Sequence, residues 1–349
     1  MKDLEEKLRA KPSDPKQKHL FSGASFIPIL VLTILPAPLL NASTSLFFLE
    51  IQGVAGYSSG DGKVIAYSMS PTETMQKPGL GFDYVRRFSG QTGDIAVLSV
   101  QARLAWNSEG EKTFEPQLYN AFLKFKTRPF DVWIGHNRPA FGLSSILDNH
   151  ALLLHSLNML GFGFDRDWGV GLAKDTARGQ YGLSLTAGSG MALKINGNYF
   201  LSGRYGFGVL SEDNITAGLS LGSGKFRDVS GYTVLSESLI DFTMAAADIT
   251  WLRNNLENRI EVMAGKRGGR GTLAASWRIG LGLLDENRLK LEFQPTAILA
   301  SESKHFEYAA GLTYLAHPDW TLRAMIAHEP KMNDTRIIFQ VYYYKGITF

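Results

Sequence analysis

The sequence ends in RIIFQVYYYKGITF, residues 336–349, a strand-length run of β-branched and aromatic residues. Successive side chains of an extended strand point to opposite faces. One face of this segment is therefore apolar and consists of Ile337, Phe339, Val341, Tyr343, Ile347 and Phe349. Lys345 is the one charged residue on that face, and Gln340 lies on the opposite face. The pattern predicts a strand with one side in an apolar environment and the other side in water.

The same alternation recurs along the chain. In segment 272–281, Leu273 and Trp277 oppose Arg278, and segments 94–106 and 288–296 alternate in the same way. A soluble antiparallel sheet would also alternate, so the number of segments is the discriminating observation. We count about 16 such segments, although 14 would also fit the length. So many half-apolar strands favour a transmembrane antiparallel β-barrel, which crosses the bilayer with strands of about 10 residues.

The connections between these segments alternate between short and mostly longer. The short ones are rich in turn-forming residues and lie at 89–93, 127–129, 175–179, 211–214, 253–257, 285–287 and 317–319. The others lie at 58–78, 107–113, 138–162, 190–198, 224–238, 266–270, 300–304 and 329–334. Outer-membrane barrels have short periplasmic turns and longer external loops. The sequence therefore predicts an all-β fold of this type, in the bacterial outer membrane, with both chain ends on the periplasmic side.

The first residues have the character of a targeting segment. Residues 1–20 are polar and basic, residues 24–40 are almost uncharged, and small residues follow, which is the order of a secretory signal. Proline disfavours the alternative of a membrane-anchoring helix, and the apolar run contains Pro28, Pro36 and Pro38. We expect a signal peptide over 1–42, cleaved between 42 and 45, and a barrel domain over 43–349.

Composition excludes several other classes of protein. The 349 residues are 44% hydrophobic and 20% charged, with no cysteine and a net charge of +3. The absence of cysteine removes disulfides, thiolate catalysis and cysteine zinc sites. The charge balance is not that of a nucleic-acid-binding protein. We expect no enzymatic activity, no cofactor, no metal site and no nucleic-acid partner.

The longest predicted connection, 138–162, has features of a loop that folds into the barrel. It contains the apolar run 151–154, which would be a liability on an exposed loop. Folded inward, the loop would narrow the channel, with Arg138 at its root and Arg166 just beyond it flanking the constriction. His150 and His155, five residues apart, do not share a helical face and are expected to cap or to face the lumen.

Strand parity predicts which charged residues face the lumen. The candidate pore-lining cations, besides Arg138 and Arg166, are Arg103, Lys124, Arg278 and Arg323. Two interpretations remain open. Either these cations are neutralised by acidic partners across the lumen, or they make a pore that attracts anions.

Two stretches resemble a known family. DVWIGHNRPAFGL (131–143) and FDRDWGVGLAK (164–174) are similar to the phosphate-selective porin O/P family. The matching residues are Gly135, Arg138, Pro139, Phe141, Gly142, Arg166, Gly169 and Val170. The resemblance implies a 16-stranded channel, often trimeric, with some anion-selective members. The arginine ladder and lysine cluster of its phosphate-specific members have no residue-by-residue match here. The final Phe349 resembles the terminal signal that the barrel-assembly machinery recognises.

These observations predict a porin for the passive diffusion of small hydrophilic solutes or ions, with a possible preference for anions. The expected partners are outer-membrane lipid, lipopolysaccharide, the barrel-assembly machinery and further copies in a homotrimer. One alternative is a structural barrel that sheathes a partner such as an electron-transfer cytochrome. Another is a lipase-like barrel enzyme with a lipid-side Ser–His pair, for which His305 near Ser301 and Ser303 is the local candidate.

Overall fold

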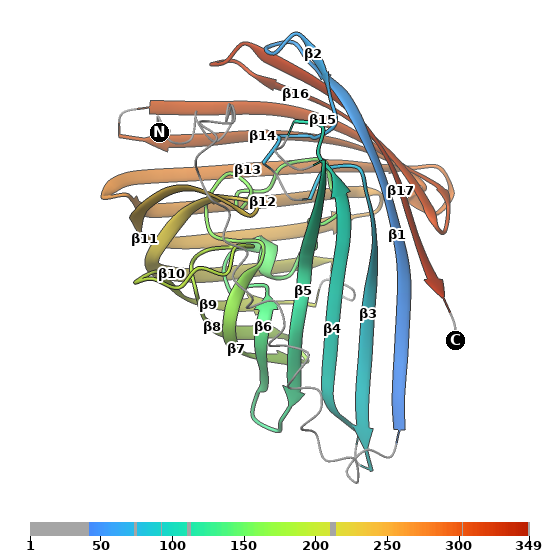
Figure 1. Ribbon diagram of the computed structural model, residues 1–349, viewed down its shortest axis with the longest axis vertical. Coiled ribbons are helices and arrows are strands. Elements are labelled where there is room, and N and C mark those ends of the chain that lie inside the picture. Colours follow the sequence, from blue (N-terminus) through green and yellow to red (C-terminus); the bar gives the residue numbers. More distant parts are fainter. Residues whose placement is uncertain are drawn as a thin grey trace.

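The chain forms a closed β-barrel. The computed structural model describes residues 42–72, 75–91, 93–109, 113–209, 214–301 and 303–347. Strand β1 (Ala42–Ser58) pairs with β3 (Gly79–Gly90) on one side and with β17 (Asp334–Ile347) on the other. This pairing closes the sheet, so blue β1 lies beside red β17 in Figure 1. Closure leaves no unpaired edge along β1 and β17, as a barrel in lipid requires.

Sixteen strands make up the barrel, and β2 (Lys63–Ile65) is a short additional strand paired to β1. The others are β4 (Gly93–Trp106), β5 (Phe114–Lys126), β6 (Asp131–Asn137), β7 (Asp167–Thr176), β8 (Gly179–Thr186), β9 (Tyr199–Phe207), β10 (Ile215–Ser230), β11 (Thr233–Arg253), β12 (Leu256–Arg267), β13 (Arg270–Leu283), β14 (Leu289–Ala300), β15 (Ser303–His317) and β16 (Trp320–Glu329). Two 3₁₀ turns, Leu143–Ser145 and Asp285–Asn287, complete the regular structure. The prediction of 16 antiparallel strands is confirmed.

Side chains alternate between the two faces of the wall as predicted. Trp277 and Phe339 are 42% and 60% exposed on the outer surface, whereas Arg278 is 7% exposed inside. Lys345, on the outer face, lies 4.0 Å from Asp319 at the nearby turn, so its charge is compensated. Trp133 is buried, and its ring packs against Gly171 inside the barrel.

The two ends of the barrel differ. All seven predicted short connections lie at one end, together with the start of β1 and the end of β17; we call this the turn end. Connections 59–78, 138–166 and 187–198 lie at the opposite end, the loop end. The prediction of a long connection over 224–238 is wrong, because β10 and β11 continue to a turn at 231–232. Polar residues interrupt the apolar pattern on both faces of this hairpin tip, which obscured its strands in the sequence.

The wall is much lower on one side than on the other. Strands β6, β8 and β9 have 7, 8 and 9 residues, whereas β10 and β11 have 16 and 21. β6 ends at Asn137, and the chain then turns into the barrel, so the edge of β5 above Ala121 has no strand partner on that side. The green segments inside the barrel in Figure 1 belong to the connection that leaves β6.

Some predictions concern residues outside the described part of the chain. The signal peptide over 1–42 lies almost entirely before the first described residue, and Phe349 lies beyond the last one. The signal, its cleavage between 42 and 45 and the assembly role of Phe349 stay predictions. Within the described residues, no helix has the length and apolar character of a membrane-spanning segment.

Candidate channel constriction

Connection 138–166, which we call the inner loop, enters the barrel and is fixed at its start by the wall. The backbone N–H of Leu143 donates to Glu261 Oε1 at 2.6 Å, and that of Gly142 donates to Ser220 Oγ at 3.1 Å. Gly142 has φ +67°, and a Cβ there would lie 2.6 Å from Glu261 Oε1. Glycine is therefore required for the loop to approach β12 this closely.

Aromatic and apolar side chains fasten both ends of the inner loop to β9–β12. Phe141 makes edge-on contacts with Phe200 and Phe242, at ring-centroid distances of 5.6 and 5.8 Å. Leu157 and Leu160, near the other end of the loop, are buried in the same cluster. Such edge-to-face pairs stabilise by about 0.5–1.5 kcal/mol beyond the burial of their area.

The middle of the inner loop reaches the opposite wall through two histidine–carboxylate pairs. His150 Nε2 lies 2.7 Å from Glu50 Oε1 on β1, and His155 Nδ1 lies 3.0 Å from Glu307 Oε1 on β15. All four side chains are buried. Neither histidine was predicted to have a carboxylate partner, because β1 and β15 are distant in sequence. The loop therefore spans the lumen from β9–β12 to β15 and β1.

The apolar run of the loop seals against the wall, as predicted. Leu153 and Leu154 are each 3% exposed and belong to a buried cluster with residues of β1, β2 and β15–β17. Backbone carbonyls in this run also have partners, because Arg278 Nη2 donates to Leu154 O at 3.1 Å and Gln294 Nε2 donates to His155 O at 2.6 Å. The loop is thus held both by apolar packing and by hydrogen bonds from wall side chains.

Arg138 and Arg166, predicted to flank the constriction, converge on Asp148 in the inner loop. Arg138 Nη2 lies 2.9 Å and Arg166 Nη2 lies 3.7 Å from Asp148 Oδ1. Partial loss of hydration raises the pKa of Asp148, but the two arginines outweigh this effect and hold the pKa at about 2. The side chain of Asp148 is 57% exposed, so this ion cluster borders open space. Asp148 was missed in the sequence, where nothing singles out one acidic residue of a loop.

Arg166 itself is almost completely buried. Its guanidinium lies over the Tyr119 ring, 4.1 Å from the centroid, and Nη1 is 3.2 Å from Asp165 Oδ2. Tyr119 is the extra residue of a bulge in β5, since Gln101 pairs with Asn120 and Ala102 with Leu118. The bulge turns the tyrosine ring inward and fixes the arginine beneath the loop.

The other candidate cations have different surroundings. Arg103 is neutralised, with Nη1 3.7 Å from Glu50 Oε1 and Nε donating to Gln117 Oε1 at 2.7 Å. Arg278 and Arg323 donate to the neutral amides of Gln294 and Gln340 and have no carboxylate within 4.0 Å in the described part of the chain. Lys124, half-buried on β5, likewise has no such carboxylate there. Some of the candidate cations are thus paired with carboxylates, and three have no carboxylate within 4.0 Å among the described residues.

The space left in the lumen bears on the alternative functions. The inner loop crosses the lumen between opposite walls, and one cavity beside it has a volume of about 140 Å³. A loop fixed to both walls obstructs a partner of the size of a haem protein, so this geometry does not support a sheath for a cytochrome. His305 is buried and lies 3.1 Å from Glu329, on the inward face shared with Glu307. The lipase-like alternative requires a histidine that faces lipid, and His305 does not face lipid.

Metal binding has no support in the described residues, where no group of three or more His, Asp or Glu side chains could hold an ion. His150 and His155 each face a single carboxylate instead.

Known proteins of similar structure are bacterial outer-membrane porins and channels. The anion-selective porin from Comamonas acidovorans superposes with a TM-score of 0.61 at 10% identity, over 87% of this chain and 100% of that chain. OmpF of Salmonella typhi, in a complex with daunomycin, gives a TM-score of 0.60 at 9% identity, over 87% and 97% of the two chains. A loop L8 deletion mutant of OmpT, an outer-membrane protein of Vibrio cholerae, gives 0.64 at 11% identity, over 87% and 100%.

The fold is therefore that of the 16-stranded outer-membrane porins. No protein-family model matches the sequence, and no curated protein matches it. Identities of 9–11% establish the common fold and leave the solute to be argued from the residues.

Proposed function

We propose that the protein is a passive channel of the bacterial outer membrane for small hydrophilic solutes or ions, and not an enzyme. The observation that carries this proposal is the inner loop, which is fixed to opposite walls of the barrel and sets the narrowest level of the lumen. The inner loop, rather than the number of strands, then sets the width of the passage. We therefore expect a small conductance for a barrel of this size.

A weak preference for anions is part of the proposal. Arg278, Arg323 and Lys124 have no carboxylate within 4.0 Å among the described residues, and charges in a narrow pore attract counter-ions. The excess is small, because the inward carboxylate of Glu261 also lacks a cationic partner within that distance in the described part. The resemblance to the phosphate-selective porin O/P family supports the channel and the anion preference. It does not extend to phosphate itself.

The position of the protein in the envelope follows from the same proposal. The start of β1 and the end of β17 both lie at the turn end, which supports periplasmic termini. A trimer form of OmpT of Vibrio cholerae is among the similar structures, and it supports the expectation of a homotrimer. Outer-membrane lipid surrounds the exposed apolar band, lipopolysaccharide contacts the loop end, and the barrel-assembly machinery recognises the end of the chain.

Single-channel recording tests the proposal. The protein in a planar bilayer should conduct KCl, and deletion of residues 148–158 should raise its conductance severalfold, because the loop no longer crosses the lumen. The double substitution Lys124→Gln and Arg323→Gln should move the reversal potential in a salt gradient toward the potassium equilibrium potential. Lys266→Gln, at the loop-end tip of β12 where the side chain is exposed, is the matched control for loss of a cation. A deletion that leaves conductance unchanged would contradict the role of the loop.

A further inference from the structure

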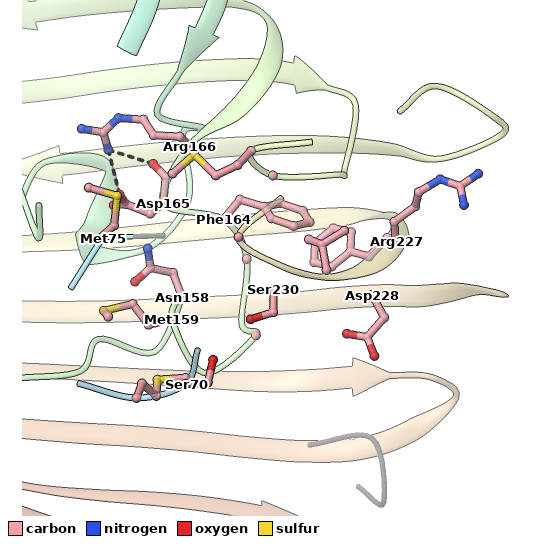
Figure 2. A pocket seen from close by; sticks show the side chains of 18 of the residues that line it. Ser70, Met75, Asn158, Met159, Phe164, Asp165, Arg166, Arg227, Asp228 and Ser230 are labelled. Carbon is pink, nitrogen blue, oxygen red and sulfur yellow. Dashed lines mark hydrogen bonds and ion pairs between the residues drawn. The ribbon is translucent and has the colours of Figure 1, made fainter. Parts of the chain in front are cut away.

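A cavity of about 140 Å³ lies at the loop end and has features of a ligand site. It is enclosed by connection 59–78, the inner loop, connection 187–198 and the tip of the β10–β11 hairpin. Figure 2 shows the side chains that line it. The cavity adjoins the ion cluster of Asp148, because Arg166 belongs to both.

The lining is unusually rich in thioethers. Four of the nine methionines of the chain line the cavity, together with the rings of two phenylalanines. The residues are Met69, Met75, Met159, Met191, Phe164 and Phe226. Thioethers are flexible and polarisable and make favourable contacts with aromatic rings. A cavity of ~150 Å³ is large enough for benzene, so the methionine and phenylalanine part of this lining suits a planar apolar group of about that size.

The polar groups of the cavity include a donor and an acceptor that have no hydrogen-bond partner in the described part of the chain. One is Asn158 Nδ2, on a residue that is 8% exposed, and the other is Asp165 Oδ1. The remaining polar atoms of these side chains are occupied, because Ser156 Oγ donates to Asn158 Oδ1 and the Tyr119 hydroxyl donates to Asp165 Oδ2. A buried donor and a buried acceptor without partners destabilise the protein unless a ligand or water binds them.

The two unsatisfied groups lie on one side of the cavity. Figure 2 shows the amide nitrogen of Asn158 turned toward Asp165, with Met75 and Met159 beside them. They are not hydrogen-bonded to each other. A group that both accepts and donates hydrogen bonds would bridge them: its oxygen would accept from Asn158 Nδ2, and its N–H would donate to Asp165 Oδ1.

Charge argues for a neutral ligand. Arg166 is compensated by Asp148 and Asp165, and Arg227 Nη1 lies 2.8 Å from Glu237 Oε2. The unsatisfied atom of Asp165 belongs to a carboxylate and would repel a second carboxylate. The arrangement therefore disfavours an aromatic acid, although the proposed pore prefers anions.

We propose that this cavity binds a small neutral aromatic carboxamide, with the ring among the methionines and the amide between Asn158 and Asp165. The proposal rests on the channel function only for how the solute reaches the cavity. Conductance in KCl without any other solute tests the channel function, and ligand binding in detergent tests the cavity. Failure of either proposal is therefore distinguishable from failure of the other.

Binding of benzamide to the folded protein in detergent, measured by calorimetry, tests the site. Acetophenone has the same ring and the carbonyl but no N–H, so it should bind about tenfold more weakly, as expected for one lost hydrogen bond to a charged acceptor. Benzoate should bind more weakly still. Equal affinity for benzamide and acetophenone, or no binding of benzamide, would overturn the proposal.

Variants localise the binding. Asn158→Leu keeps the size of the side chain but removes the donor, and it should weaken benzamide binding about tenfold. Asn196→Leu, an exposed position in connection 187–198, is the matched control and should leave the affinity unchanged. Heat-modifiable migration in gels shows that each variant is folded. An Asn158→Leu protein that is folded and binds benzamide normally would place the ligand elsewhere and refute the assignment.

Discussion

At the scale of single residues, the charge at the constriction depends on Asp148. This carboxylate compensates Arg138 and Arg166, at 2.9 and 3.7 Å. The sequence predicted the two arginines but not the acid that neutralises them. The local charge is therefore lower than a count of the predicted cations suggests.

Replacement of Asp148 by asparagine should make the channel more anion-selective, because both arginines lose their partner while the side chain keeps its shape. We expect the chloride-to-potassium permeability ratio to rise roughly twofold to fivefold, as for a partly solvated charge. Reversal potentials in a KCl gradient measure this ratio. Asp285→Asn, an exposed residue at the turn end, is the control. An unchanged ratio for Asp148→Asn would show that ions pass far from this cluster.

The pKa of Asp148 also predicts how the wild type responds to pH. Its value of about 2 in the folded protein lies below the ~3.9 of free aspartate. Asp148 therefore compensates the two arginines fully above about pH 4, and this compensation is lost as the pH falls through about 2. Near pH 2 the wild type should approach the selectivity of the asparagine variant, and the difference between the two proteins should be constant from pH 5 to 8.

At the scale of elements, the β10–β11 hairpin closes a gap that the short β6 leaves. The edge of β5 above Ala121 has no strand partner on the β6 side. Tyr232, at the tip of the hairpin, fills this gap: the N–H of Leu118 donates to its hydroxyl oxygen, and its O–H donates to Leu118 O at 3.0 Å. The hairpin thus crosses the loop end and binds the far wall through one side chain.

Tyr232→Phe should loosen this contact without unfolding the barrel. The loss of about 1 kcal/mol for the hydrogen bonds should speed local hydrogen exchange of the 114–120 segment roughly fivefold. Hydrogen exchange followed by mass spectrometry measures this, and Tyr205→Phe on the outer surface serves as the control. Identical exchange in both variants would mean that the hairpin is held by other contacts, such as the one between Thr72 and Ser230.

At the scale of the whole molecule, the barrel has a lipid side and a water side, and the two should differ in reactivity. The chain has no cysteine, so single cysteines are unambiguous probes. Phe293 is 47% exposed on the outer surface, and the inward side chain of Lys290 on the same strand is 27% exposed. Arg278 is a poorer choice, because the inner loop covers it.

In isolated outer-membrane fragments, a membrane-impermeant thiol reagent should label Lys290→Cys at least several times faster than Phe293→Cys. The outward position is surrounded by lipid, and the inward one is in contact with water. After solubilisation and unfolding in denaturant, both cysteines should react equally, which controls for intrinsic reactivity. Equal labelling in the membrane would contradict the barrel assignment of this strand.

Alternation in the sequence was sufficient to determine the class of fold. Residues such as Trp277 and Arg278 lie on opposite faces because the side-chain period of a strand is two, and this holds whatever the strand pairs with. The inward course of the 138–162 segment was also predictable, since its apolar run needs a partner. The length of the β10–β11 hairpin was not predictable, because a strand that extends beyond the apolar band loses its alternating pattern.

The tertiary structure alone decided the chemistry of the lumen. Glu50 meets His150 and Arg103, and Tyr232 meets Leu118, across sequence separations that local patterns do not reveal. Closure of the barrel sets these distances, because the pairing of β1 with β17 fixes where each wall lies. The bulge at Tyr119 then determines where Arg166 lies. The two-residue period of a strand, which is visible in the sequence, determined which side chains face inward. Only closure and register of the barrel determined which of these side chains meet.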